Sequence, residues 1–369
     1  TGLGKRIAYN LIAAFGSSSL RLAYALALSD LILAPATPSN TARVGGVIMP
    51  ITTSLAKAFG SEPQDGPRKI GSFLMQSIYQ VNTITSAMFQ TSMAGNTLVA
   101  ALALQSFGIG ITWGDWAMAA IVPGIVALLI MPYFIYKVYP PEIRDAREAQ
   151  QMIREELRGL GKMSFQEWVM LGVFVLALVL WATSQFTKLD ATTVAFLGIS
   201  ILLATSVLVW DDVKSEKGAW DTLVWMGTLM GFAGFLSKLG FIKWATVLVG
   251  GYIPEGSWII AFVIAVLINT YSHYVFASLT AHISAMFVAF SAIAISAGAP
   301  PMLTLLMIAF TSNLCMSLTH YAAGPSPVIF NTGYVPQNTW WKLGFFASVI
   351  NLIIFMGLGS VWMKAIGMW

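Results

Sequence analysis

Long stretches without a charged side chain constrain this chain more than any other feature of its sequence. Residues 70–114 and 256–341 contain no Asp, Glu, Lys or Arg. Only 10% of the 369 residues are charged and 57% are apolar, whereas an average soluble domain is about 25% charged. These values exclude a soluble enzyme and a nucleic-acid-binding protein. They predict an all-α membrane protein with several transmembrane helices.

Runs of about 20 apolar residues identify the ordinary spans, because a helix of that length crosses a hydrocarbon core roughly 30 Å thick. The two charge-free stretches are too long for one helix, and they carry polar residues with Gly or Pro, as in 90–97 and 317–325. Such breaks are tolerated at membrane depth only where the backbone lines a cavity or is buried in protein. We therefore predict a broken helix in each stretch. Ordinary spans are predicted at 116–136, 168–187, 191–210, 222–237 and 343–363.

Charged residues concentrate in the segment 140–163, which carries five basic and five acidic side chains. This pattern predicts a short, solvated surface helix with i,i+4 ion pairs that links two halves of the molecule. Lys and Arg also occur in 57–69 and 211–219. If the linker is cytoplasmic, both of these loops lie on the same side, as the distribution of Lys and Arg in membrane proteins favours.

A weak internal repeat relates the two halves. A shift of 239 residues places Ser39–Arg43 on Ser278–His282, and a shift of 228 places Met88–Thr91 on Met316–Thr319. The predicted spans between the two Ser-x-Thr motifs are 71–111, 116–136, 168–187, 191–210 and 222–237. Because five is an odd number, the two copies have opposite orientations in the membrane. An inverted-topology repeat of this kind is typical of secondary transporters, which bind substrate near the midplane where broken helices meet.

The first copy lacks elements that the second copy has. Three spans within 168–237 precede the second copy, and no counterpart precedes 3–16. We therefore expect the first repeat to be N-terminally incomplete, with three more spans in the native protein. The predicted units are 1–139 and 164–369, joined by the linker 140–163. Each unit contains an amphipathic segment (3–16 and 239–253), a re-entrant hairpin (18–60 and 257–297), a broken span (71–111 and 300–335) and a final span (116–136 and 343–363).

The two hairpin tips, Ser39–Thr41 and Ser278–Thr280, carry the polar groups best suited to a ligand. Neutral hydroxyl and amide groups at helix N-termini bind anions such as carboxylates, and unwound carbonyls suit Na⁺. An ordinary N-cap turn is the alternative interpretation of each motif. The recurrence of the motif within charge-free stretches favours a binding site.

Four further polar residues lie next to the tips or the breaks. Arg43 and His282 occupy matching positions beyond the tips, where each either offsets substrate charge or pairs with protein carbonyls. His320 lies beside the second break and is either a substrate contact or a buried neutral histidine. Asp30 is the only acid in the hairpin arms. An intramembrane acid is a functional candidate by default, and a structural cap or an interfacial position explains it equally well.

Several segments resemble one family of membrane transporters. Residues 34–43 resemble the first Ser-Asn-Thr hairpin of the divalent anion:sodium symporters. Residues 271–282 resemble the second hairpin of one branch of that family. This branch holds the bacterial citrate, tartrate and succinate carriers and the plastid 2-oxoglutarate/malate translocators. Shorter segments that resemble the same branch are 313–314, 318–321, 333–335 and 340–345.

The resemblance implies roles for the tips and for the breaks. It assigns a first Na⁺ to the first tip with Ser92, and a mirrored second Na⁺ to Ser278 with Ala322. Leu279 stands where the family motif has Asn, which puts the second sodium site in doubt. The residues implied to hold the first Na⁺ are Ser39, Asn40 and Ser92, and those implied to bind substrate are Ser39, Asn40, Thr41, Thr91, Ser278, Thr280 and Thr319.

These observations and the resemblance together predict a secondary active transporter of small di- or tricarboxylates, of the malate, succinate, 2-oxoglutarate or citrate class. The resemblance implies elevator-type alternating access, coupled by Na⁺ symport or by carboxylate exchange, with no cofactor besides Na⁺. No metalloprotease motif, nucleophile elbow or acid pair supports an enzyme. A cation/proton exchanger or channel is the alternative function. Asp30 is the residue that discriminates between the two functions, because such exchangers need a membrane-buried acid. We further expect a homodimer through the scaffold, in a bacterial inner membrane or a plastid inner envelope.

Overall fold

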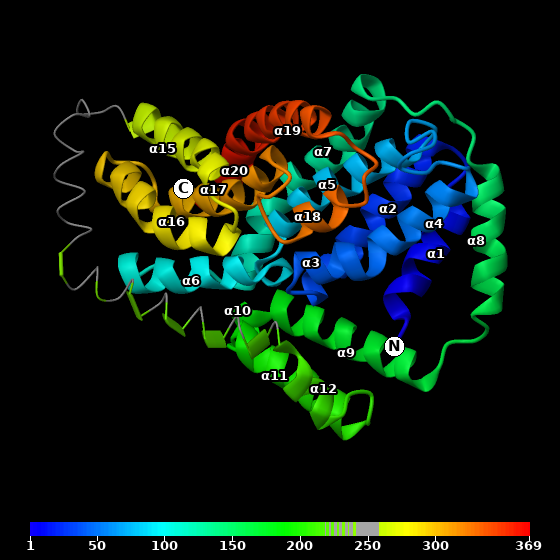
Figure 1. Cartoon of the computed structure of the whole chain (residues 1–369). Coiled ribbons are helices and arrows are strands. Elements are labelled where there is room, and N and C mark those ends of the chain that lie inside the picture. Colours follow the sequence, from blue (N-terminus) through cyan, green and yellow to red (C-terminus); the bar gives the residue numbers. More distant parts are fainter. Residues whose placement is uncertain are drawn as a thin grey trace.

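The computed structural model describes residues 1–217 and 258–369 and only scattered positions between them (Figure 1). This described part is helical and contains no named β-strand, as the sequence predicts for an all-α protein. The predicted span 222–237 and the amphipathic segment 239–253 lie outside the continuously described residues, and so does residue 257 at the start of the second predicted hairpin.

The first half alternates long helices with short irregular segments. Breaks separate α2 from α3 and α5 from α6, in the two places where the sequence predicts a hairpin tip and a broken helix. The elements in chain order are α1 (Leu3–Phe15), α2 (Ser19–Leu33), η1 (Ala34–Ala36), α3 (Asn40–Arg43), η2 (Val44–Ile48), α4 (Met49–Ala58), α5 (Gly71–Met88), η3 (Gln90–Ser92), α6 (Ala94–Phe107) and α7 (Trp113–Val138).

The second half shows the same alternation after an outer helix and a pair of exposed helices. Breaks separate α15 from α16 and α17 from α18. The elements are α8 (Arg147–Gly159), α9 (Phe165–Ala182), α10 (Ser184–Thr187), α11 (Ala191–Ala204), α12 (Trp210–Ser215), α15 (Trp258–Ser272), η4 (His273–Val275), α16 (Leu279–Ser296), α17 (Pro301–Leu314), η5 (Cys315–Leu318), α18 (Pro325–Phe330), α19 (Gln337–Leu352), η6 (Ile353–Gly359) and α20 (Ser360–Ala365).

Seven described helical segments are long and apolar enough to cross a bilayer, so the chain is an integral membrane protein with several spans. The predicted spans 116–136, 168–187 and 343–363 fall on α7, on α9 with α10, and on α19 to α20. The seven segments are Ser19–Ala36, Trp113–Val138, Phe165–Ala182, Trp258–Val275, Leu279–Ser296, Pro301–Leu318 and Gln337–Ala365.

The predicted span 191–210 is wrong in its length. Helix α11 ends at Ala204, which makes it roughly 21 Å long at about 1.5 Å per residue. The chain turns because Ser206 adopts a left-handed backbone conformation with φ of 57°, which a continuing right-handed helix excludes. The run of apolar residues continues through the turn, and for this reason hydropathy alone overestimated the span.

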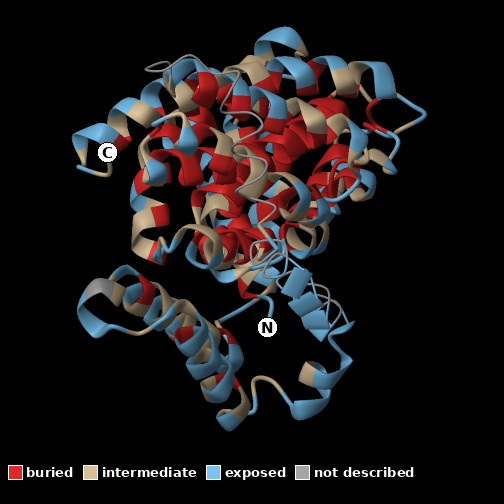
Figure 2. Cartoon of the chain, turned by 90° about the vertical axis from the view of Figure 1, so that its left-hand side faces the viewer, coloured by how far each residue is buried: buried red, intermediate tan, exposed pale blue. Residues whose placement is uncertain are grey.

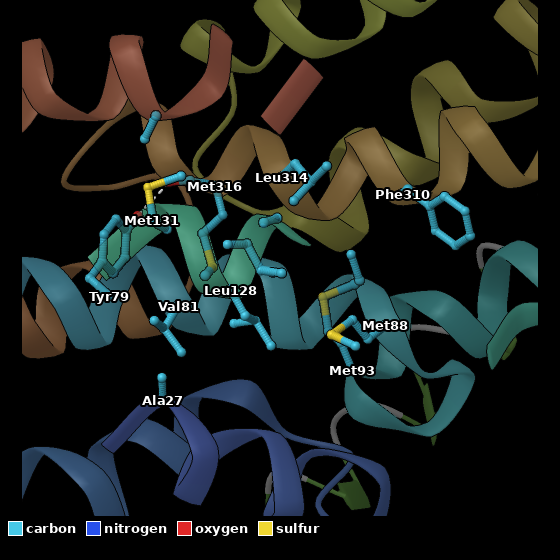
Figure 3. Close-up of a cluster of buried hydrophobic side chains, with 14 of the residues drawn as sticks. Ala27, Tyr79, Val81, Met88, Met93, Leu128, Met131, Phe310, Leu314 and Met316 are labelled. Carbon is cyan, nitrogen blue, oxygen red and sulfur yellow. Dashed lines mark hydrogen bonds between the residues drawn. The ribbon is translucent and has the colours of Figure 1, made fainter. Parts of the chain in front are cut away.

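Helix α5 runs through the centre of the molecule, and all of its residues are buried. Figure 3 shows its side chains between helices of both halves: Val81 faces Ala27 of α2, and Tyr79 and Met88 lie beside residues of α7 and α17. The buried apolar cluster is continuous across these helices. The two broken helices, α5 with α6 and α17 with α18, therefore share one core.

Helix α8 lies along the outside of the first half (Figure 1). It is the predicted surface helix, but it is less solvated than predicted, because Ala149, Gln150 and Ile153 are buried. The side chains of Gln150 and Arg154 donate hydrogen bonds to the Ala13 carbonyl at 2.9 and 3.0–3.1 Å. These bonds satisfy a carbonyl at the end of α1 that has no partner within its own helix.

Helices α9 to α12 stand apart from the main body (Figure 2). Only 17% of the span Phe165–Ala182 is buried, against 89% of Pro301–Leu318. A stack of Phe89, Trp113 and Trp181, with ring centroids 5.8 and 6.0 Å apart, joins this arm to the first break. The exposed apolar faces of α9 and α11 are the surfaces that lipid or further protein would cover.

Candidate functional site

The first tip is a turn built by proline and a serine cap. Pro35 lies in η1 and Pro38 precedes the cap; proline fixes φ and lacks an N–H, which prevents α2 from continuing. Ser39 then caps α3, because its Oγ accepts a hydrogen bond from the Ala42 N–H at 3.1 Å. The first N–H groups of the segment that begins at Asn40 are therefore placed at the turn.

The second tip is built in the same way. Ser278 caps α16, and its Oγ accepts a hydrogen bond from the Ala281 N–H at 3.3 Å. The exposure of the tip residues also matches, with an exposed first, a buried second and a half-buried third position in each tip. These positions are Ser39, Asn40 and Thr41 in the first tip and Ser278, Leu279 and Thr280 in the second.

Both tips line one cavity of about 710 Å³. This volume falls within the range of about 300–1,000 Å³ that small-molecule sites occupy. The remaining wall comes from the turns at 93–94 and 323–324, which are the two helix breaks, and from Glu216 and Ala219, which follow α12. The described residues that line the cavity are Thr37, Pro38, Ser39, Asn40, Thr41, Ala42, Met93, Ala94, Glu216, Ala219, Ala277, Ser278, Leu279, Thr280, Ala323 and Gly324.

A larger cavity, of about 910 Å³, opens between α6, α7 and the segment around Lys188. Neither tip contributes to its described lining, which is mainly apolar apart from Lys188, Asp190 and a few uncharged polar residues. The cavity between the tips is the better candidate site, because two separate helix N-termini and four hydroxyl-bearing tip residues converge there.

Two predicted substrate residues, Thr91 and Thr319, are not among the described residues that line the cavity. The Thr91 hydroxyl donates to the Pro35 carbonyl at 2.6 Å and accepts from the Trp113 indole N–H at 3.0 Å. It therefore fixes the first tip to the first break. The Thr319 hydroxyl is buried and has no hydrogen-bond partner within the described part of the chain.

The predicted sodium-site residues of the breaks are occupied by protein contacts. The Ser92 hydroxyl is 2.6 Å from the carbonyl oxygens of both Ser86 and Phe89. The Ser92 carbonyl accepts a hydrogen bond from Arg43 at 2.9 Å. At the second break, the Ala322 carbonyl lies 2.9 Å from the Nε2 of His273.

Arg43 points into the protein rather than into the cavity. Its Nε donates to Asp30 Oδ1 at 2.9 Å, and the side chains of both residues are almost fully buried. Its other nitrogens donate to the carbonyls of Thr37 and Ser92 and to two hydroxyl groups of α5. Asp30 also accepts hydrogen bonds from Asn82 and from a hydroxyl of α5. The structure thus agrees with a protein-pairing role for both charged residues.

The two candidate histidines make different contacts. His282 is fully buried, and its Nε2 lies 3.1 Å from the Ser272 hydroxyl. His320 is half-buried, and its Nδ1 accepts a hydrogen bond from the Trp341 indole N–H at 3.0 Å. Neither is among the cavity-lining residues that the structure describes.

Sequence reasoning missed two residues that shape the site. A side chain at Gly324 would collide with Thr41, so the glycine allows the second break to approach the first tip. The Tyr79 hydroxyl donates to the Met316 carbonyl and lies 3.2 Å from the Thr319 carbonyl, so it ties α5 to the second break. The Gly-Pro pair at 324–325 was a usable signal for the first contact, and no local signal marks the second.

Comparison with known proteins places this architecture in a family. The family model described as the sodium:sulfate symporter transmembrane region matches residues 1–369. The chain is 50% identical to a Bacillus subtilis (strain 168) protein named "Putative malate transporter YflS", over all of this chain and 77% of that protein. It is 46% identical to "Dicarboxylate transporter 1, chloroplastic" of Spinacia oleracea, over all of this chain and 65% of that protein.

A third relative, "Inner membrane protein YbhI" of Escherichia coli (strain K12), is 41% identical over all of this chain and 77% of its own length. The chain therefore spans between 65% and 77% of the length of these three relatives. The family model and these three relatives each match the chain over its full length. The chain belongs to the sodium:sulfate symporter family.

Proposed function

We propose that the protein is a secondary transporter of small dicarboxylates and not an enzyme, and that its substrate binds in the cavity between the two tips. The observation that carries this proposal is the convergence of Ser39–Thr41 and Ser278–Thr280 on one cavity. The names of its relatives, a malate transporter and a dicarboxylate transporter, point to the same substrate class.

Each tip offers one carboxylate a set of neutral donors. The exposed hydroxyls of Ser39 and Ser278 and the half-buried hydroxyls of Thr41 and Thr280 border the cavity. Backbone N–H groups at the start of each capped helix add partial positive charge. Two such tips suit a substrate with a carboxylate at each end, and a hydrogen bond to a charged group contributes about 1.5–3 kcal/mol.

The lack of a positively charged side chain in the described lining favours release of the substrate after binding. The described lining contains no Lys or Arg, and Glu216 is its only charged residue. Arg43 lies behind the first tip, where Asp30 largely neutralises it. Binding by dipoles and neutral donors avoids the strong ion pair that would retain a dianion.

We further propose that coupling occurs by exchange of carboxylates rather than by Na⁺ symport. Backbone carbonyls at both breaks, the groups best suited to Na⁺, already bond to Arg43 and to His273. The second tip also lacks a side-chain amide, because Leu279 stands there in the position that Asn40 occupies in the first tip. These contacts occupy one backbone carbonyl at each break that a sodium ion would otherwise use.

The two halves, 1–139 and 164–369, would act as inverted repeats around the linker 140–163. Matched hairpin tips, matched serine caps and a broken helix in each half support this part of the proposal. The hairpins and broken helices would move as one body against α9 and α11, the poorly buried helices that form the scaffold and a homodimer interface. The membrane would be a bacterial inner membrane or a plastid inner envelope.

The alternative, a cation/proton exchanger or channel, requires a buried acid that is free to change its protonation. Asp30 accepts hydrogen bonds from Arg43, Asn82 and Thr85. A guanidinium and two further protein donors thus engage the Asp30 carboxylate, which commits it to contacts within the fold. The contacts of Asp30 therefore favour carboxylate transport.

Uptake of labelled malate into proteoliposomes tests the substrate class. We expect saturable uptake that unlabelled malate, succinate and 2-oxoglutarate reduce, and that monocarboxylates such as lactate leave unchanged. Uptake inhibited equally by lactate would contradict binding at two tips. A proton- or cation-driven flux without any carboxylate would instead favour the exchanger or channel.

A further inference from the structure

Two histidines and the only cysteine of the chain form a buried cluster behind the second tip. His273 lies in η4, His282 in α16, and Cys315 begins η5. All three side chains are fully buried, and one ligand atom from each lies within 4.8 Å of the other two. None of the three is among the described residues that line the cavity between the tips.

Hydrogen bonding determines which nitrogen of His273 is free. Its Nε2 lies 2.9 Å from the carbonyl oxygen of Ala322. Because a carbonyl oxygen only accepts, the neutral ring carries its proton on Nε2 and keeps a lone pair on Nδ1. This Nδ1 is buried and has no hydrogen-bond partner in the described ranges.

The same reasoning applies to His282. The Ser272 hydroxyl is placed to donate to the Asn269 carbonyl at 2.9 Å, and in that arrangement its oxygen accepts the proton of His282 Nε2, which lies 3.1 Å away. The neutral ring again keeps a lone pair on Nδ1, which is buried and unpartnered as far as the structure describes the chain. Two lone pairs are therefore buried without a donor, in two rings whose centroids are 4.8 Å apart.

We propose that the Nδ1 atoms of His273 and His282 and the Sγ of Cys315 form a binding site for a thiophilic metal ion such as Zn²⁺. Imidazole and thiolate are the preferred ligands of zinc, at about 2.0–2.1 Å and 2.3 Å. Histidines that bind metal usually donate their other N–H to a carbonyl or a similar acceptor, as both rings do here. One ring nitrogen of each histidine and the Cys315 Sγ already lie within 4.8 Å of one another, so side-chain rotations would complete the coordination.

Binding would replace one proton by the metal ion without any change of oxidation state. The Cys315 thiol, which now donates to the Ser312 carbonyl at 3.3 Å, would release its proton to solvent and bind as the thiolate. Three protein ligands leave one tetrahedral position for a solvent molecule. The ion would join η4, α16 and η5, and it would thereby fix the second tip to the second break and inhibit any movement between them.

Metal binding to the purified protein tests the proposal independently of transport. We expect Zn²⁺ to bind saturably at one ion per chain, and Co²⁺ in its place to show the charge-transfer absorption of a thiolate ligand. Cys315→Ala should lose this absorption. Ser272→Ala removes the acceptor of the His282 N–H and none of the three ligands, so it should keep the absorption and weaken binding roughly 10–100-fold.

Two results would overturn the metal site. One is the absence of saturable binding at one ion per chain by calorimetry of the wild-type protein, which requires no variant. The other is an unchanged cobalt spectrum in Cys315→Ala, or in Cys315→Ser if the alanine variant is not monodisperse. Because neither measurement involves a carboxylate, failure of the metal site and failure of the proposed transport function are distinguishable.

Discussion

In the proposed site, Ser39 and Ser278 would each cap a helix and donate to the substrate with one hydroxyl group. The oxygen accepts a hydrogen bond from the backbone of its own helix, at 3.1 and 3.3 Å, while the residue remains exposed to the cavity. A serine hydroxyl has one proton to donate besides its acceptor lone pairs. The cap fixes the oxygen, and the proton stays available for a substrate carboxylate.

Removal of a tip hydroxyl should therefore weaken transport without abolishing folding. We expect Ser39→Ala and Thr280→Ala each to lower uptake efficiency by roughly 10- to 150-fold, the equivalent of about 1.5–3 kcal/mol for a hydrogen bond to a charged group. Concentration-dependent malate uptake measures the effect. Ser296→Ala is the matched control, because its hydroxyl bonds within the far end of α16. Wild-type uptake in both tip variants would contradict a shared ligand.

The charges of Arg43 and Asp30, in contrast, pair with each other inside the protein and do not face the cavity. Removal of one partner from a buried ion pair leaves an uncompensated charge, at a cost of about 3–5 kcal/mol. We expect Arg43→Gln to lower the thermal stability of the purified protein strongly. The double variant Arg43→Gln with Asp30→Asn should recover much of the loss. If the single and double variants unfold at the same temperature, the pair does not carry this energy.

At the scale of elements, the breaks decide how the site is assembled. The polar and glycine-rich segments 90–97 and 317–325 predicted both broken helices, because backbone at membrane depth needs such an environment. The sequence also located both tips. It did not indicate that Thr91 and Arg43 fix the first tip to the first break, because those contacts depend on side-chain directions that no periodicity reports.

The contact between α18 and the first tip leads to a prediction at this scale. A methyl group at Gly324 would collide with Thr41, and the backbone of Gly324 is right-handed helical, so the effect of Gly324→Ala is steric. We expect about 1–3 kcal/mol of destabilisation, as overpacking usually costs, together with weaker uptake. Thermal unfolding and uptake are measured on the same preparation.

A second variant separates packing from binding in this contact. Thr41→Ala removes the Oγ1 that an alanine at 324 would meet at 2.2 Å and leaves only the Thr41 Cβ at 3.3 Å, so Gly324→Ala with Thr41→Ala should regain much of the stability while uptake stays low. Additive losses of stability in the double variant would show that the two residues do not meet.

On the scale of the whole molecule, hydropathy predicted the membrane-spanning kind of the described helices better than their lengths and partners. α11 ended early at a turn within an apolar run, and α8 proved to be packed against α1 rather than fully solvated. The two errors have different causes: hydropathy does not report a turn within an apolar run, and the charge pattern of α8 does not report which of its residues pack against protein. The sequence alone could not predict the cavity, because residues as far apart in the chain as Thr37 and Gly324 form its walls.

Coupling is a property of the whole molecule, and the contacts at the two breaks predict it. Because Arg43 and His273 already bond to the carbonyls of Ser92 and Ala322, we expect labelled malate uptake to depend on malate or 2-oxoglutarate inside the proteoliposome. Replacement of external Na⁺ by choline should change the rate less than twofold. The matched control is uptake into vesicles without internal carboxylate, which should be near background in either salt. A steep dependence on Na⁺, with two or more ions per substrate and no need for internal carboxylate, would contradict exchange and assign free sodium ligands to these breaks.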